Sequence, residues 1–328
     1  MSRGSSMHTL EETTRMIESG TPLMISGAQH LMDRLPPGHW IGGTSYYFMT
    51  EQGGRREEEL LHVQRLPPAV EQTRVQVYDQ ATIVNVYKDI PPGGFAIIIL
   101  PAFSDVHREF GLHSQHYAEF ALRPLMGWVA GVPRENMLTQ HAMVYDGRST
   151  GFHQRAVVMH CTLRHEAMVE LDVINIFRQG HGDALTFPED SFEVTTCWVN
   201  GEPRRLVDYL QEQHIDRRLP LVADYMGTSV TVDLGVVDEA AGKVTLFAPV
   251  MRDITYRFAE PVSDYPRALR AALPSVDPDR LVFCVNCVDN YFYGGLEGER
   301  LGMFVGPCTF GEVAYQLLNQ TIVYALLS

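Results

Sequence analysis

Cysteine is scarce in this sequence, with 5 residues among 328. A disulfide framework would need many more for a chain of this length, so a reduced compartment is favoured. The sequence also has no apolar run long enough to cross a bilayer, and residues 1–9 lack the apolar segment of a secretory signal. We therefore expect a cytoplasmic protein that has no membrane partner.

Positive charge is also limited, because 26 Lys and Arg stand against 40 Asp and Glu, which gives a formal net charge of −14. Nucleic acids are bound through basic surfaces, so this balance argues against a nucleic-acid partner. The sequence contains no Gly-x-Ser-x-Gly elbow, no phosphate-binding Gly-x-x-x-x-Gly-Lys loop and no Gly-x-Gly-x-x-Gly fingerprint. The sequence therefore predicts no cofactor.

The chain does contain 45% hydrophobic residues, enough for a large core. Its length predicts two domains, and we place them at residues 1–188 and 189–328, with the break in the connection around residues 186–190. Strand-like runs outnumber helical ones along the chain. We expect an α/β (α+β) fold in which each half has mixed, largely antiparallel sheets flanked by helices.

Several elements are indicated by local patterns. Residues 10–18 are amphipathic and predict a helix, and Asn200-Gly201 is a dipeptide typical of a hairpin turn. Residues 81–87 and 95–100 are rich in β-branched side chains, as are residues 280–288, and each of these runs predicts a strand. Residues 104–130 are expected to be largely helical.

The stretch from Gly306 to Thr321 combines a glycine-proline turn with a single carboxylate. Thr309 followed three residues later by Glu312 matches a capping box, in which the two side chains satisfy the free N–H groups of a helix start. We therefore expect a helix to begin after Thr309. The N–H groups of such a cap can also bind anions.

Two sets of side chains were weighed as metal or redox sites. Of His107, His113 and His116, the last two are three apart and can share a helix face, whereas Gly111 interrupts the helix between them and His107. The spacing of a zinc-protease helix is absent, so solvated or packed histidines are favoured and no metal is predicted. Cys284 and Cys287 are three apart on a predicted strand and would face opposite sides. Cys308, in the glycine-proline turn, is the strongest candidate for a reactive thiol.

Short motifs in both halves resemble the FIST family of intracellular sensory domains. The resemblance rests on the order of these motifs: Trp40-Ile-Gly-Gly-Thr-Ser45, Val199-Asn-Gly-Glu-Pro203, the strand ending in Cys284-Val-Asn-Cys287, Gly311-Glu-Val313 and Asn319-Gln-Thr321. Cys287 stands where that family has an arginine, and Gly43 where a cysteine is common. By this resemblance the two domains correspond to the N- and C-terminal FIST units.

The resemblance implies a small-molecule-binding protein of signal transduction, whose ligand is an amino acid or a related metabolite and whose signalling partner is a separate protein. A glycine pair in a strand marks either a ligand passing over the backbone or a packing bend. The implied ligand contacts lie where the halves meet: Gly42, Gly43, Thr44, Ser45, Asn286, Cys287, Cys308, Thr309, Gly311 and Glu312. A metal- or thiol-dependent hydrolase, a protein-interaction scaffold and a homo-oligomer remain open as alternatives.

Overall fold

The computed structural model describes residues 6–137, 139–148, 150–225 and 228–328. Within these residues the chain forms five sheets, and six α-helices pack against them. Most neighbouring strands are antiparallel, and the parallel pairs are β2 with β3, β8 with β9 and β22 with β23. The expected α+β class with mixed, largely antiparallel sheets is confirmed.

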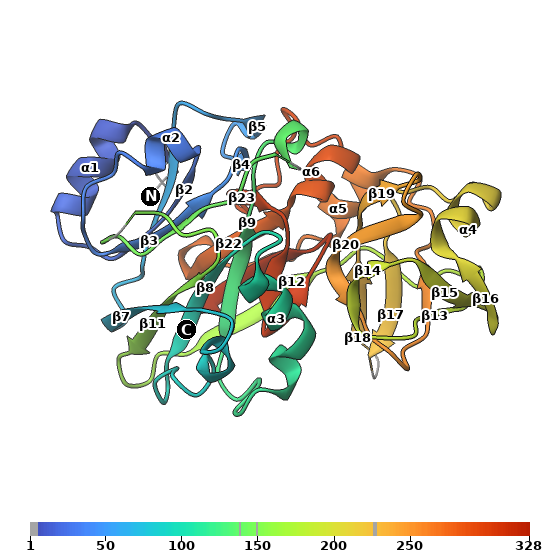
Figure 1. Cartoon of the computed structure of the whole chain (residues 1–328). Coiled ribbons are helices and arrows are strands. Elements are labelled where there is room, and N and C mark those ends of the chain that lie inside the picture. The colour runs from blue at the N-terminus through green and yellow to red at the C-terminus, as the bar shows by residue number, and fades with distance from the viewer. Residues whose placement is uncertain (1–5, 138, 149, 226–227) are drawn as a thin grey trace.

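Three sheets form the N-terminal and central body (Figure 1). The first has the order β1 (Met7–His8), β6 (Leu61–Arg65), β2 (Leu23–Gly27), β3 (Trp40–Thr44) and β10 (Val144–Tyr145). The second has the order β25 (Gln316–Leu318), β24 (Glu312–Ala314), β9 (Leu125–Ala130), β8 (Phe95–Pro101), β11 (Ala156–Leu163) and β7 (Val70–Tyr78). The third has the order β12 (Val169–Ile174), β26 (Ile322–Leu327), β22 (Leu281–Cys287), β23 (Gly306–Thr309), β4 (Tyr47–Thr50) and β5 (Gly53–Arg56).

Two further sheets build a lobe beside this body, seen at the right of Figure 1. One has the order β16 (Glu202–Arg205), β15 (Thr196–Val199), β13 (Leu185–Thr186), β21 (Tyr256–Phe258), β17 (Leu221–Tyr225) and β18 (Thr228–Val232). The other has the order β14 (Ser191–Val194), β20 (Lys243–Val250) and β19 (Leu234–Asp238). The chain thus leaves the body after β12, builds the lobe and then returns.

The helices are short and lie at the edges of these sheets. They are α1 (Leu10–Glu18), α2 (Gln29–Met32), α3 (Asp105–His113), α4 (Leu206–Glu212), α5 (Tyr265–Ala272) and α6 (Val288–Tyr293), with 3-10 turns η1 (Ile83–Asn85), η2 (Ser114–His116), η3 (Arg134–Asn136) and η4 (Pro278–Arg280). No helix in the described part of the chain combines the length and the apolar character that a bilayer crossing needs.

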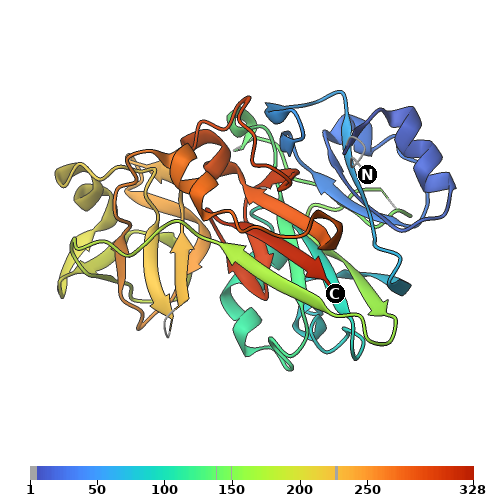
Figure 2. The same ribbon diagram turned by 180° about the vertical axis from the view of Figure 1, so that it is seen from behind.

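The C-terminal strands complete the central body. Figure 2 shows β26 running between β12 and β22. In the sequence, β12 precedes the lobe and β22 follows it. In the same way β23 pairs with β4, and β24 pairs with β9. Central sheets therefore combine strands from before and after the lobe. The boundary drawn between residues 188 and 189 stays a prediction.

Several expected elements are found and others are corrected. The helix at Leu10–Glu18, the strand Leu281–Cys287 and the hairpin turn at Asn200-Gly201 are present, and both turn residues have positive φ (52° and 88°), as a type I′ turn requires. The strand expected at residues 81–87 is wrong: Thr82 N–H donates to the Asp79 carboxylate, and this starts a short helical turn. The helix expected over residues 104–130 ends early, and Leu125–Ala130 is strand β9.

The helix start expected after Thr309 is also wrong. Gly306–Thr309 is strand β23, and it is hydrogen-bonded to β4 on one side and to β22 on the other. Backbone groups that are paired in a sheet are not free to begin a helix. The side chains of Thr309 and Glu312 nevertheless meet, with 3.3 Å between Oγ1 and Oε1.

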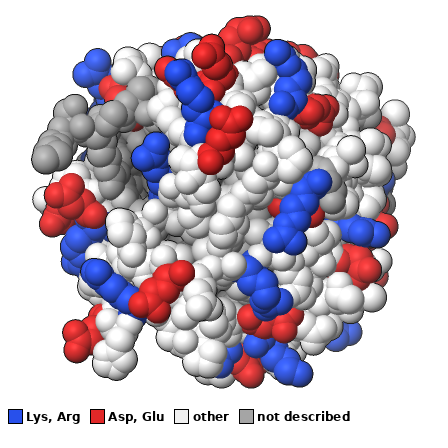
Figure 3. All heavy atoms as spheres, turned by 90° about the vertical axis from the view of Figure 1, so that its left-hand side faces the viewer, with Lys and Arg blue, Asp and Glu red and all other residues white. Residues whose placement is uncertain are grey.

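Charged side chains are interspersed on the face that Figure 1 shows on its left. On the described part of that face, acidic and basic groups alternate over a largely uncharged surface (Figure 3). The excess of negative charge is therefore not concentrated there.

Candidate functional site

Helix α6 follows directly from strand β22, in the middle of the third sheet. Cys287 is the last residue of the strand and also the N-cap of the helix, with an extended backbone (φ −72°, ψ 140°). Gly294 ends the helix, and its N–H donates to the Asn290 carbonyl over 2.9 Å. This strand-to-helix turn places Cys287, Asp289 and Asn290 in the interior. Tyr291 is buried as well, whereas Phe292 and Tyr293 are half-buried.

Beneath α6 lies a group of buried acids and a thiol, which we call the acid–thiol cluster: Asp233, Cys287, Asp289 and Glu312. One side-chain ligand atom of each of the first three lies within 4.8 Å of the others. Cys287 Sγ is 4.0 Å from Asp233 Oδ2, and the Asp233 and Asp289 carboxyl groups share a hydrogen bond. Glu312 is hydrogen-bonded to Cys287 and is 0% exposed. The four side chains therefore form one continuous group.

The acid–thiol cluster joins the lobe to the body. Asp233 lies between strands β18 and β19 of the lobe, whereas Cys287 and Asp289 belong to the body. The turn Asn319–Thr321 supports both sides, because Asn319 Oδ1 accepts a hydrogen bond from the Asp233 N–H (3.4 Å), and Thr321 Oγ1 donates to Glu312 (2.8 Å).

Two polar side chains extend this network. Asn290 donates through Nδ2 to the Thr321 carbonyl (3.2 Å) and to Asn286 Oδ1 (2.8 Å), and it accepts a hydrogen bond from the Tyr265 hydroxyl. Asn286 Nδ2 is buried and has no hydrogen-bond partner. Tyr265 also lines a cavity of about 470 Å³ between the lobe and the body. The network therefore runs from the cluster toward the surface.

Burial controls the protonation of the acid–thiol cluster. It raises the pKa of Glu312 to about 8 and the pKa of Asp289 to about 6. The pKa of Asp233 is raised well above its ordinary range, first by burial and then by the neighbouring Asp289 charge. Burial likewise raises the pKa of the Cys287 thiol. Within the described residues none of the four has an ion-pair partner, so protons or a cation must balance their charge.

The donor set of this cluster suits a divalent cation. Carboxylate oxygens and one thiolate are ligands of Zn²⁺ and of similar transition metals, which displace the protons on binding. Without a cation the same groups would store protons at neutral pH. Both behaviours follow from one property, the burial of several acids that form no ion pair within the described residues. The one basic group that affects them is more distant: the Arg134 charge lowers the pKa of Asp289.

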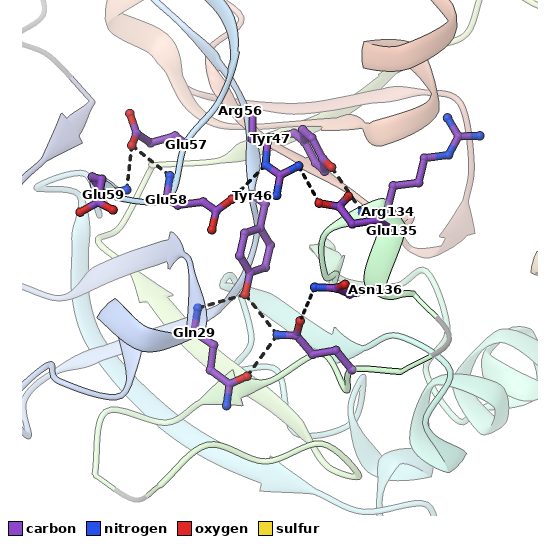
Figure 4. Close-up of polar contacts among 11 residues, drawn as sticks. Gln29, Tyr46, Tyr47, Arg56, Glu57, Glu58, Glu59, Arg134, Glu135 and Asn136 are labelled. Carbon is purple, nitrogen blue, oxygen red and sulfur yellow. Dashed lines mark hydrogen bonds and ion pairs between the residues drawn. The ribbon is translucent and has the colours of Figure 1, made fainter.

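A second feature lies on the outer side of α6, where a cavity of about 460 Å³ is lined by Tyr47, Arg56, Arg134, Glu135, Tyr291, Phe292 and Glu297. We call it the α6 cavity. Arg56 spans its rim and pairs with Glu58 (2.8 Å) and Glu135 (2.7 Å). Figure 4 shows this pairing, with the Arg134 guanidinium directed away from it.

Some of the residues expected at a ligand site belong to the acid–thiol cluster or touch it. Cys287 and Glu312 are members, and Thr309 Oγ1 contacts both Glu312 and the Asn286 carbonyl (3.2 Å). The cluster thus gathers residues that the sequence analysis singled out from two separate strands.

The other expected residues serve packing contacts. A Cβ added to Gly42 would lie 2.4 Å from the Ile25 carbonyl oxygen, so this glycine permits close strand packing, and Gly43 and Gly311 pack against side chains in the same way. Thr44 is hydrogen-bonded to Met143, and Ser45 Oγ donates to the Cys308 carbonyl over 3.1 Å. Cys308 is buried, and burial raises the pKa of its thiol.

The three histidines that are candidates for metal ligands lie in different environments. His107 is buried in α3, its Nδ1 accepts a hydrogen bond from the Phe103 N–H, and burial lowers its pKa to about 3. His113 and His116 are exposed. Among the described residues, the side chains that lie close enough together to share a metal ion are instead those of Asp233, Cys287 and Asp289.

The sequence analysis did not find Asp233 and Asp289. Each acid stands inside an apolar run, Val230-Thr-Val-Asp-Leu234 and Cys287-Val-Asp-Asn-Tyr291. A charged residue at such a place is rarely buried unless it is paired or functional. This signal could have identified both residues, although it could not have shown that they meet.

Comparisons with known proteins give one match. No curated protein and no solved structure matches the chain. The resemblance to the FIST family is wrong, because the family model that matches is a different one and spans nearly the whole chain, and the FIST names given to the two domains are withdrawn with it. The chain belongs to DUF6976, a family of unknown function, whose model matches residues 8–328.

Proposed function

We propose that this protein is a metal-binding protein that holds one divalent cation of the Zn²⁺ class at the acid–thiol cluster. Asp233, Cys287 and Asp289 supply three ligands, and Glu312 is the adjacent fourth group. The observation that carries the proposal is that the three ligand atoms lie within 4.8 Å of one another. One cation would balance the charge that these buried groups carry when ionised.

The burial of the cluster favours a structural role for the cation. Structural zinc sites are closed and four-coordinate, whereas catalytic sites keep one position open to water or substrate. The three ligand residues are at most 5% exposed, and Asp233 comes from the lobe. A bound cation would therefore tie the lobe to the body. A hydrolase that uses His107, His113, His116 or Cys308 has less support. The three histidines are not in the group of described residues that could hold a metal ion, and burial raises the pKa of the Cys308 thiol.

Cobalt binding tests this proposal directly. We expect the purified, chelator-treated full chain to take up one equivalent of Co²⁺ and to show a thiolate-to-cobalt charge-transfer band, which Zn²⁺ removes by competition. Cys287→Ser should lose the band and more than about 100-fold in affinity, because even the loss of groups that only support a metal ligand costs 10–100-fold. Cys284→Ser is the matched control, since Cys284 lies on the same buried strand.

Two results would overturn the proposal. One is the absence of stoichiometric Co²⁺ and Zn²⁺ binding by a folded sample. The other is a charge-transfer band that persists in Cys287→Ser. Asp289→Asn provides a second variant that retains side-chain volume, and its affinity should fall while its circular dichroism stays that of the wild type.

A further inference from the structure

The α6 cavity contains two charged side chains that have no ionic partner. Arg56 is already neutralised by Glu58 and Glu135. Within the described residues, in contrast, Arg134 is in no ion pair, and the Glu297 carboxylate accepts no hydrogen bond. A cation and an anion thus line one cavity without neutralising each other.

The Arg134 guanidinium is held in position by the aromatic residues of α6. Its Cζ lies 4.8 Å from the centre of the Phe292 ring and 5.7 Å from that of Tyr293. One of its N–H groups donates to the Tyr293 hydroxyl over 3.4 Å. Stacking on rings leaves the remaining N–H groups of a guanidinium free to bind a carboxylate through two parallel hydrogen bonds. Figure 4 shows this side chain extended beside the Arg56–Glu135 pair.

Glu297 lies on the opposite segment, after α6. Its backbone forms a bridge with Gly54, and the Gly54 carbonyl accepts a hydrogen bond from the Gly298 N–H (2.8 Å). A Cβ added to Gly54 would lie 2.2 Å from the Leu296 carbonyl oxygen, so the two segments are in close contact. This packing fixes the backbone that carries the Glu297 carboxylate.

Aromatic rings line the α6 cavity together with these charges. The Tyr47 ring lies 4.9 Å from Phe292 and 5.4 Å from Tyr291, centre to centre. The Tyr291 hydroxyl is buried and has no hydrogen-bond partner. The volume of about 460 Å³ is within the range of small-molecule sites.

We propose that the α6 cavity binds a small zwitterion with a flat apolar body. Arg134 binds its carboxylate, Glu297 binds its ammonium group, and the rings of Tyr47 and Phe292 contact the body between them. The residues that line this site differ from the four of the acid–thiol cluster, although the Arg134 charge reaches Asp289 and lowers the pKa of that carboxyl. The site does not depend on a bound metal. It also differs from the site expected between Gly42–Ser45 and Cys308–Glu312.

Four probe compounds test the charge pattern of the ligand. Two are zwitterions: L-phenylalanine, with both charges at one end, and 4-(aminomethyl)benzoate, with a ring between the charges. The other two carry one charge each, phenylacetate and phenethylamine. Isothermal titration of the full chain, in the presence of a chelator, should give at least tenfold tighter binding for one zwitterion than for both single-charge compounds. The zwitterion that binds more tightly shows whether the site accepts the carboxylate and the ammonium group at one end of the ligand or at opposite ends of a ring.

Two variants test the residues. Arg134→Gln and Glu297→Gln should each weaken binding of the preferred zwitterion at least tenfold, whereas Arg15→Gln and Glu11→Gln on α1 should leave it unchanged. Both zwitterions binding no tighter than the single-charge compounds, or an unchanged affinity in the two cavity variants, would overturn the proposal. Because chelator is present, failure here would leave the metal-binding proposal standing, and the reverse also holds.

Discussion

Without metal, the protein is expected to lose stability as the pH rises from about 5 to 8, and Zn²⁺ is expected to reverse this trend. Glu312 has an ordinary pKa of 4.5, and burial raises it to about 8 in the folded state. Between these values the folded state holds a proton that the unfolded state has released. Stability therefore falls with rising pH over this range, and the fall ends above the folded pKa.

Asp289 acts in the same direction over a lower range, because its pKa rises from 3.8 to about 6. The two groups together should make the metal-free protein most stable in mild acid. The contribution of Glu312 alone is on the order of 4 kcal/mol between the two ends of its range.

Zn²⁺ should reverse the sign of the slope of stability against pH, because it binds the deprotonated groups. Its affinity rises with pH, and a ligand that binds only the folded state stabilises it in proportion to the logarithm of that affinity. Urea unfolding at a series of pH values, with chelator and with excess Zn²⁺, measures both slopes. For the wild type, we expect the free energy of unfolding to fall with rising pH in the presence of chelator and to increase with rising pH in excess Zn²⁺.

The variant Glu312→Gln is the control that separates the contribution of this carboxyl group to the pH dependence of stability from the contributions of all other groups. The substitution removes the titrating proton and retains the side-chain volume, so the metal-free variant should lose the part of the pH dependence that Glu312 contributes. Asp289 and Asp233, whose pKa values are also raised, should supply the part that remains. Glu11→Gln, an exposed residue on α1, should leave the slope unchanged. Equal slopes in the wild type and in Glu312→Gln would contradict the raised pKa.

Among substitutions that add one methyl group to the central body, Gly127→Ala is expected to destabilise the protein most. Gly127 lies in β9 opposite Ile98 of the parallel neighbour β8. A Cβ at this position would lie 1.8 Å from the Ile98 carbonyl oxygen, and a backbone atom in a paired strand cannot move aside as a side chain can. Relief of the clash requires separating the two strands.

We expect Gly127→Ala to lower the free energy of unfolding by more than about 3 kcal/mol, beyond the usual cost of overpacking. The matched control is Gly182→Ala, because an added Cβ there meets no atom within 4 Å. Chemical denaturation of both variants measures the difference. A stability of Gly127→Ala within about 1 kcal/mol of the control would show that β8 and β9 separate more easily than their packing indicates.

The elements that the sequence predicts correctly are those fixed by neighbours along the chain. The helix Leu10–Glu18 has its N-cap, Thr9, directly before its nine residues, which carry the apolar stripe. The turn Asn200-Gly201 needs only two residues that accept positive φ. The strand Leu281–Cys287 is apolar except for Asn286, and a nearly continuous apolar run is typical of a buried strand.

Thr309 and Glu312 show where local patterns stop being sufficient. Their spacing matches a helix cap, but Gly306–Thr309 is paired with β4, which lies more than 250 residues earlier in the sequence. The backbone hydrogen bonds of two neighbouring strands outweigh the local preference. The two side chains still touch, but they do so inside the protein, beside the acid–thiol cluster.

The sequence by itself determined the α+β class, the helix Leu10–Glu18 and the strand Leu281–Cys287, because each depends on the periodicity and turn chemistry of a few adjacent residues. The tertiary structure alone decided the acid–thiol cluster. Asp233 and Cys287 are 54 positions apart, and they meet only because the chain builds a complete lobe before returning to the central sheets. That packing buries these residues. The burial raises the pKa values of the acids and, in our proposal, makes the residues a cation site.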